Sequence, residues 1–133
     1  MNNILISADS RYPVSRPKIK RNLDRILSEK KVTSAVEISV LICGTRQARK
    51  LAKKYLRDEK PHNVLSFSQE DRKNTGWSVK LGDNKTFLLL GDIVVCYPIA
   101  QKEANRDNMM VDEKINELVG HGLLHLLGEH HES

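Results

Sequence analysis

The chain has little cysteine, and the two cysteines that it has are far apart. Cys43 and Cys96 are the only ones among 133 residues, and they form no CxxC pair. This pattern argues against a disulfide-rich scaffold and against a cysteine-based zinc site. Both lie in apolar, strand-like segments, so we expect two buried and reduced thiols.

Long apolar runs are also missing. The longest, at residues 87–90 and 93–96, are far shorter than the roughly 20 residues that a membrane-spanning helix needs. The first residues, MNNILIS, have neither a basic segment nor a long apolar one, which predicts no secretory signal. We therefore expect a cytoplasmic protein without a membrane partner.

Size and charge narrow the class further. A chain of 133 residues is typical of one domain with a real core, so we expect a single domain over residues 1–133. The formal net charge of +5 favours a polyanionic partner.

Hydrophobic periodicity predicts a mixture of strands and helices. Strands are expected at residues 4–6, 36–43, 63–67 and 86–96, the last being a strand pair or one strand broken at Gly91-Asp92. Helices are expected at residues 17–31, 46–56 and 98–106 and from residue 111 onward, and residues 69–85 are expected to form a loop or small hairpin. Helices between strands, with two helices at the end, indicate an α/β or α+β fold of about four strands, and we expect α+β.

The helix expected at residues 46–56 has an unusual charge pattern. One face is apolar (Ala48, Leu51, Ala52 and Tyr55). The other face is basic, has no acidic residue, and is followed by Arg57; it comprises Arg46, Arg49, Lys50, Lys53 and Lys54. Such a face is either ordinary solvated surface or a contact for a nucleic-acid backbone.

Four of the five histidines lie in the segment HGLLHLLGEHH, residues 121–131. His121 and His125 are four residues apart, which places two imidazoles on one helix face about 6 Å apart. Gly128 stands where a helix-ending glycine would reverse the chain and bring His130 or His131 back. The spacing favours His131 as third ligand and leaves His130 facing solvent. Three histidines with a fourth position open to water are typical of a catalytic zinc; the alternative is an amphipathic helix with incidental polar residues.

The spacing H-x-x-x-H-x-x-G-x-x-H is that of metzincin peptidases, with one difference. Those enzymes carry a glutamate base directly after the first histidine, and this chain has Gly122. A metallopeptidase remains an alternative, with Glu129 as the nearest acid. Gly120 and Gly122 each cost a helix about 1 kcal/mol relative to alanine. They indicate a close approach, either by a bound substrate or by a packed neighbouring element.

Three segments together resemble the YbeY family of bacterial endoribonucleases. The tail at residues 121–131 resembles that family's HGxLHLxGxDH signature. KPHNVLSF, residues 60–67, is similar to its KPTDVLSF strand, and LGDIVVC, residues 90–96, to its LGDIVI strand. The resemblance spans most of the chain and implies a mixed sheet of about four strands with four or five helices packed on it.

The resemblance also implies a function. It predicts a zinc-dependent, single-strand-specific endoribonuclease that acts in ribosomal RNA processing, including 16S 3′-end maturation, and in ribosome quality control. One Zn²⁺ would be held by His121, His125, His131 and a water molecule. The implied partners are single-stranded RNA and the small ribosomal subunit, and DNA is not specifically indicated. A zinc-stabilised RNA-binding or ribosome-binding module without turnover is a further alternative.

Two positions depart from the family pattern. The acid that precedes the last ligand is replaced by His130, with Glu129 before it. The family's arginine after the tyrosine is replaced by Leu56, and Arg57 follows, so we expect Arg57 to be the catalytic, phosphate-binding arginine displaced by one position.

Three other residues stay outside the catalytic set. Asp92 and Ser66 lie in the strands that resemble the family and can line a cleft, although Asp92 is more readily explained as the cap of a turn after Gly91. Trp77 lies in the polar loop, where it can stack a base or cover a small core.

Overall fold

A four-stranded mixed sheet forms the centre of the computed structural model, which describes residues 2–58, 60–68 and 88–128. Its strands are β1 (Asn3–Ala8), β2 (Val36–Cys43), β3 (Val64–Ser68) and β4 (Leu88–Cys96), in the spatial order β1-β2-β4-β3. The pairs β1/β2 and β2/β4 are parallel, and β3 runs antiparallel to β4. The predicted α+β class, with about four strands in a mixed sheet, is confirmed.

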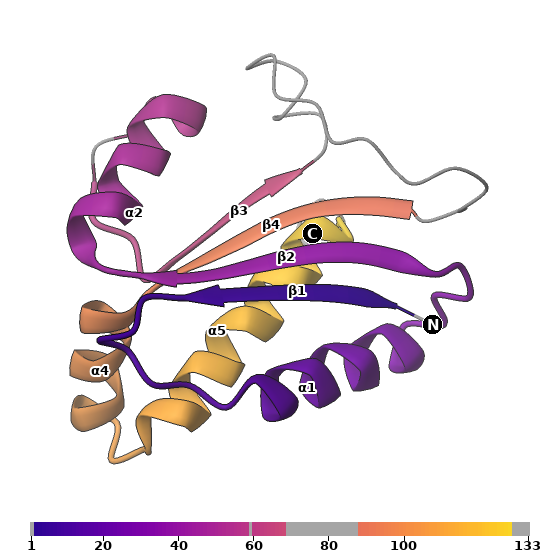
Figure 1. Cartoon of the computed structure of the whole chain (residues 1–133), viewed down its shortest axis with the longest axis horizontal. Helices are drawn as coiled ribbons and strands as arrows, with labels where there is room; N and C mark the ends of the chain where they lie inside the picture. Colours follow the sequence, from indigo (N-terminus) through magenta and orange to yellow (C-terminus); the bar gives the residue numbers. More distant parts are fainter. Residues whose placement is uncertain (1, 59, 69–87, 129–133) are drawn as a thin grey trace.

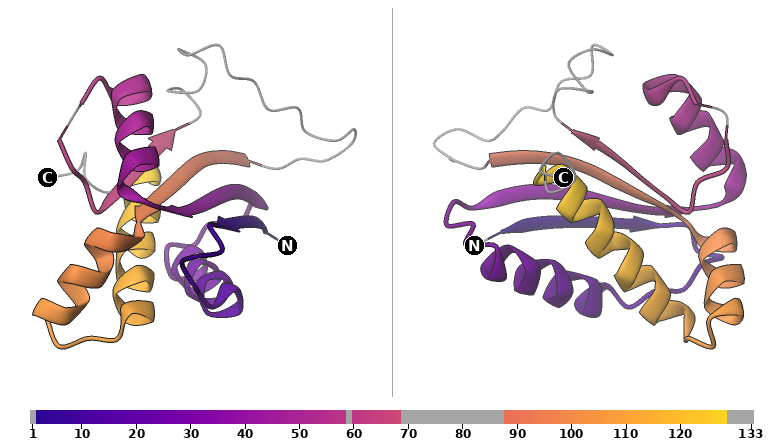
Figure 2. Two further views of the ribbon diagram at one scale, coloured as in Figure 1. Left: turned by 60° about the vertical axis from the view of Figure 1, so that its left-hand side comes forward. Right: turned by 180° about the vertical axis from the view of Figure 1, so that it is seen from behind.

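Helices cover both faces of this sheet (Figures 1 and 2). Helices α1 (Arg16–Glu29) and α5 (Val111–Leu126) lie on one face, and α4 (Tyr97–Arg106) packs beside α5 at one end. Helix α2 (Thr45–Leu51) and the π-helical turn η1 (Ala52–Leu56) lie on the other face. None of the described helices is long and apolar enough to cross a membrane.

Each face of the sheet has its own core, because alternate side chains of a strand point to opposite sides. The larger core joins α1 and α5 to one face, and its fully buried strand residues are Val36, Ile38, Val40, Ile42, Ile93 and Val95. The smaller core lies under α2 and η1 and comprises Cys43, Ala48, Ala52, Leu65, Phe67, Val94 and Cys96. This explains why β2 and β4 read as largely apolar segments, since both are buried on two sides.

Both cysteines are buried and unpaired, as expected from the sequence. Burial raises the pKa of the Cys43 thiol to about 11. The thiol therefore stays protonated at neutral pH, which makes it a poor nucleophile and a poor metal ligand.

The helix expected at residues 46–56 is not one regular α-helix. It changes at Ala52 into the π-helical turn η1, which ends at Leu56. Arg57 follows in a left-handed conformation with φ 54°. The backbone amides of Arg57 and Asp58 both donate to the carbonyl of Ala52. Helix propensities of single residues do not predict such a π-helical turn. The wider turn rotates the side chains that follow it relative to their places on a regular α-helix.

The expected break at Gly91-Asp92 is wrong, because residues 88–96 form one continuous strand. The pairing with β2 shifts register between Glu37 and Ile38, so Leu90 is an extra residue in β4. Gly91 has φ 143°, and a Cβ built on it would lie 2.0 Å from the Phe67 carbonyl oxygen. Asp92 caps no turn; it is buried in β4 and accepts a hydrogen bond from the Ser39 hydroxyl of β2.

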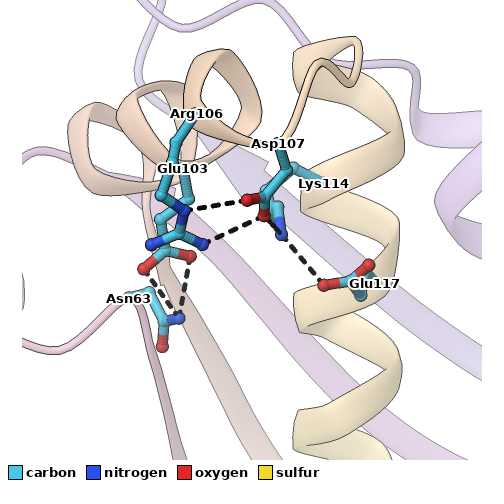
Figure 3. A network of polar contacts seen from close by, with 6 residues as sticks. All are labelled: Asn63, Glu103, Arg106, Asp107, Lys114 and Glu117. Atoms are coloured by element: carbon cyan, nitrogen blue, oxygen red, sulfur yellow. Dashed lines mark hydrogen bonds and ion pairs between the residues drawn. The ribbon is translucent and has the colours of Figure 1, made fainter.

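A polar network fixes α4 against α5 and against the start of β3 (Figure 3). The ammonium of Lys114, whose side chain is 5% exposed, contacts Asp107 at 2.9 Å and Glu117 at 3.0 Å. The Arg106 guanidinium, followed by Lys114, holds the pKa of the Asp107 carboxyl well below its usual range. The Asn63 side-chain amide donates to Glu103 at 3.0 Å and so joins the residue before β3 to α4. These contacts help to set the position of α5 relative to β3.

Candidate metal centre

A pocket of about 610 Å³ lies between the end of α5, strand β3 and the end of η1. The described residues that line it are Leu56, His62, Val64, Leu65, Ser66, Ser68, His121, Gly122, His125, Leu126 and Gly128. Segments about 60 residues apart in sequence therefore form a single concave surface. Such a pocket with convergent polar groups is the default location for a binding site.

His121 and His125 lie on the wall of this pocket that α5 provides. Both are exposed, while the neighbouring Leu123 is buried against the sheet. Their spacing on an α-helix sets them one turn apart on one face. The apolar residues of α5 anchor the helix, and the two imidazoles face the pocket.

Gly128 adopts the left-handed conformation predicted for it, with φ 82°. Helix α5 ends at Leu126, and the Gly128 amide donates to the His125 carbonyl at 3.0 Å. The left-handed turn predicted at Gly128 is therefore confirmed. His130 and His131 lie outside the described residues, as does Trp77, so the expectations for these three residues stay predictions.

The imidazoles of His121 and His125 are suitable ligands for a metal ion. Two imidazoles on one helical face, open to a pocket, are ligands that zinc commonly takes. Within residues 2–58, 60–68 and 88–128, no three His, Cys, Asp or Glu side chains gather closely enough to hold an ion. His62 therefore does not complete a ligand set with His121 and His125.

The two glycines of α5 are explained by packing. A Cβ on Gly122 would lie 2.8 Å from Cγ2 of Ile93, in the middle of β4. A Cβ on Gly120 would lie 3.2 Å from Cδ1 of Ile26 in α1. Packing against neighbouring elements accounts for the close approach at both glycines, and Gly122 also lines the pocket. A glutamate in place of Gly122 would meet the Ile93 side chain, so the base that a metzincin carries there does not fit this packing.

The structure separates Leu56 from Arg57. Leu56 lines the pocket, and Arg57, which is exposed, is not among the described residues that line it. The left-handed backbone at Arg57 is one that glycine adopts most easily. The predicted phosphate-binding arginine is therefore next in sequence to a lining residue but does not itself line the pocket as described.

The expected basic face is present on α2 and η1. Arg46, Arg49, Lys50, Lys53 and Lys54 are all exposed, and four of them line a groove of about 550 Å³ with Thr45. The opposite side of the same helix is anchored in the smaller core by Ala48 and Ala52. The last residue of η1, Leu56, lines the pocket, so the basic face and the pocket are joined by one continuous segment of chain.

His62 is a pocket residue that the sequence analysis missed. His62 lines the pocket just before β3, and its Nε2 lies 2.8 Å from Oδ2 of Asp58. The other oxygen of Asp58 accepts the backbone amide of Lys60 at 2.9 Å. That amide, followed by the His62 ring, lowers the pKa of Asp58. The sequence carries little signal for it, since His62 is the one histidine outside the tail segment.

Ser66 lies in the pocket, as the sequence analysis allowed. Residues 64, 66 and 68 of β3 face α5, while Leu65 and Phe67 are buried. Ser66 and Ser68 therefore place two side-chain hydroxyls on the β3 wall. Asp92 belongs instead to a small cavity of about 130 Å³ on the α2 side of the sheet.

Comparisons with known proteins agree with this architecture. The sequence model of the family described as Endoribonuclease YbeY matches residues 6–133. A Sulfurihydrogenibium protein named Endoribonuclease YbeY is 31% identical over 133 residues, covering 99% of this chain and 80% of the relative. The Aquifex aeolicus protein of the same name is 31% identical over 131 residues, which cover 98% of this chain and 79% of the relative.

Coverage of other relatives is lower. The namesake from Frankia casuarinae is 36% identical over 106 residues, which is 80% of this chain but 52% of the relative. This chain thus spans about half the length of that protein. A solution structure of a Thermotoga maritima protein aligns with a TM-score of 0.53 and 25% identity, over 92% of this chain and 71% of that one. The family model matches residues 6–133, and two relatives align along nearly the full length of this chain. The chain therefore belongs to the Endoribonuclease YbeY family.

Proposed function

We propose that this protein is a metal-dependent endoribonuclease that cleaves single-stranded RNA in ribosomal RNA processing. The observation that carries the proposal is the pair His121 and His125, exposed one turn apart on the wall of a pocket. The name of the relatives, Endoribonuclease YbeY, supports RNA as the substrate. Maturation of the 16S 3′ end, ribosome quality control and the small ribosomal subunit as partner belong to the same proposal, as does a cytoplasmic location.

Zinc is the proposed metal, held by His121, His125 and His131. When bound, Zn²⁺ would supply a positive charge that polarises a phosphoryl oxygen and lowers the pKa of a water molecule. The imidazoles of the ligands must be neutral to bind it, so metal affinity falls in acid. The hydroxyl of Ser66 lies on the opposite wall, where it can donate a hydrogen bond to a phosphate oxygen.

The basic face of α2 and η1 is the proposed track for the RNA backbone. Its exposed lysines and arginines would contact phosphates, which orient a strand without reading its bases. The choice of cleavage position would then be left to the pocket.

A single-stranded RNA digestion, run with metal analysis and with a chelator, tests the proposed function. The purified protein should contain zinc, cut the RNA, lose activity in chelator and regain it on addition of Zn²⁺. A protein that stays folded and binds RNA equally well with or without metal, and never cuts it, would instead be a non-catalytic binding module. Cleavage of casein without cleavage of RNA would indicate a peptidase.

Arg57→Gly is expected to lower RNA cleavage by about tenfold to a hundredfold, the effect of losing one charged hydrogen bond to a phosphate. Glycine suits the left-handed backbone at this position, so the folded state should be as stable as the parent or slightly more so. Zinc content should not change. The measurement is kcat/KM on RNA, together with chemical denaturation.

Arg57→Lys is the matched control, because it keeps the charge and loses the planar fork. It should fall between the parent and Arg57→Gly. Equal turnover in all three proteins would remove Arg57 from the proposed site.

A further inference from the structure

His62 and Asp58 form a side-chain pair at the pocket that the proposed metal site does not use. The His62 side chain is 34% exposed, and its Nε2 lies 2.8 Å from Oδ2 of Asp58. The pair is held in place from behind, because Oδ1 of Asp58 also accepts the Lys60 amide. The geometry is therefore preorganised before any substrate binds.

The contact with Asp58 determines which ring nitrogen of His62 carries the proton. The pKa of Asp58 is lowered, so at neutral pH its carboxylate is ionised and only accepts hydrogen bonds. Nε2 of His62 must then be the donor. In the neutral imidazole the other nitrogen, Nδ1, is consequently an acceptor with a lone pair.

That lone pair has no partner among the described residues. The contact between Nε2 and Asp58 is the hydrogen bond that His62 makes within the described parts of the chain. Phosphate oxygens cannot satisfy Nδ1 of a neutral ring, because they too are acceptors. A hydroxyl can, since it donates.

We propose that Nδ1 of His62 accepts a hydrogen bond from a ribose 2′-hydroxyl, and that this contact makes His62 the residue by which the pocket distinguishes RNA from DNA. The 2′-hydroxyl is the group that marks RNA at a given position. The proposal rests on the proposed function, because it assumes that a nucleic-acid strand enters the pocket of His121 and His125. Asp58 acts as a positioning residue that sets the tautomer of His62.

Two substitutions separate this role from a structural one. His62→Gln keeps a nitrogen near Nε2 for Asp58 but has no group at the place of Nδ1. His62→Asn keeps an acceptor near the place of Nδ1 and loses the contact with Asp58. If His62 binds the 2′-hydroxyl, His62→Asn should retain part of the preference for RNA over DNA and His62→Gln should not. If His62 only tethers the segment before β3, the order should be reversed.

The measurement is the ratio of affinities for a single-stranded RNA and the 2′-deoxy oligonucleotide of the same sequence. It is made by fluorescence anisotropy at pH 8 in chelator, where cleavage does not interfere. The parent should prefer RNA, and His62→Gln should lose about three- to tenfold of this preference, as expected for one neutral hydrogen bond. Asp58→Asn should lose part of the preference for RNA. The control is Asp9→Asn, which disrupts a similar exposed carboxylate contact with Arg11 and should keep the parent's affinity ratio.

Lys50→Ala in the basic groove is the control for general affinity. It should weaken RNA and DNA binding equally, because phosphate contacts carry no information about the sugar. A parent without preference for RNA, or a His62→Gln protein that keeps the parent's ratio, overturns the proposal. Failure of the proposed function looks different: the parent with Zn²⁺ would not cut RNA, whatever the affinity ratio shows.

Discussion

Replacing His121 or His125 by alanine is expected to remove bound zinc and to lower RNA cleavage at least about a thousandfold. The two imidazoles supply two of the three proposed protein ligands, and a bound metal contributes several kcal/mol to the stabilisation of charge in such a reaction. Both side chains are exposed on α5, so their removal leaves the packing of the larger core intact. The measurements are zinc content by elemental analysis and kcat/KM on single-stranded RNA.

The matched control comes from the same segment. His130→Ala removes a neighbouring histidine that the motif spacing leaves outside the ligand set, and it should keep both zinc and activity. The His121 variant should also retain the circular dichroism spectrum of the parent at low temperature. A His121→Ala or His125→Ala protein that cuts RNA as fast as the parent would show that these histidines are not part of the active site.

Gly91→Ala is expected to destabilise the fold by roughly 3 kcal/mol, a large share of the usual stability of a small domain. The added Cβ would lie 2.0 Å from the Phe67 carbonyl oxygen, which is backbone and cannot move without disturbing β3. The φ of 143° adds strain for any residue with a side chain. Chemical denaturation of the parent and the variant measures the change in the free energy of unfolding.

Gly120→Ala is the matched substitution for Gly91→Ala. The nearest atom to its Cβ is the far end of Ile26, at 3.2 Å, with Asn22 Nδ2 at 3.9 Å, and alanine gains about 1 kcal/mol of helix propensity. The free energy of unfolding should therefore stay within about 1 kcal/mol of the parent value. If Gly91→Ala is as stable as Gly120→Ala, the close contact between β4 and the backbone of β3 does not restrict position 91 to glycine.

The sequence predicted the elements well wherever the signal was local. The apolar spacing of Ile19, Leu23, Ile26 and Leu27 marked α1, and all four are buried. Gly128 was correctly identified as the turn after α5, because a glycine beyond an apolar helix is a local signal. The pair His121 and His125 needed nothing more than helical periodicity to be placed on one face.

Features that depend on distant neighbours were missed or misjudged. The strand order, the π-helical turn and the continuity of β4 through Gly91 follow from how elements pack, which periodicity does not encode. Gly122 was recognised as unusual, but its cause is Ile93, nearly 30 residues away in the chain. His62 was overlooked because it stands in a loop, and only the pocket reveals what it faces.

The position of β4 in the sheet has a consequence for the order in which the protein assembles. β4 lies between β2 and β3, yet it follows both in the chain, and its contact from Asp92 to Ser39 closes a separation of 53 residues. During synthesis neither β2 nor β3 can pair with its inner neighbour until β4 has left the ribosome. Parallel pairing of distant segments also closes large loops, which slows folding. The pocket, which needs β3 and α5 together, is therefore among the last parts of the molecule to form.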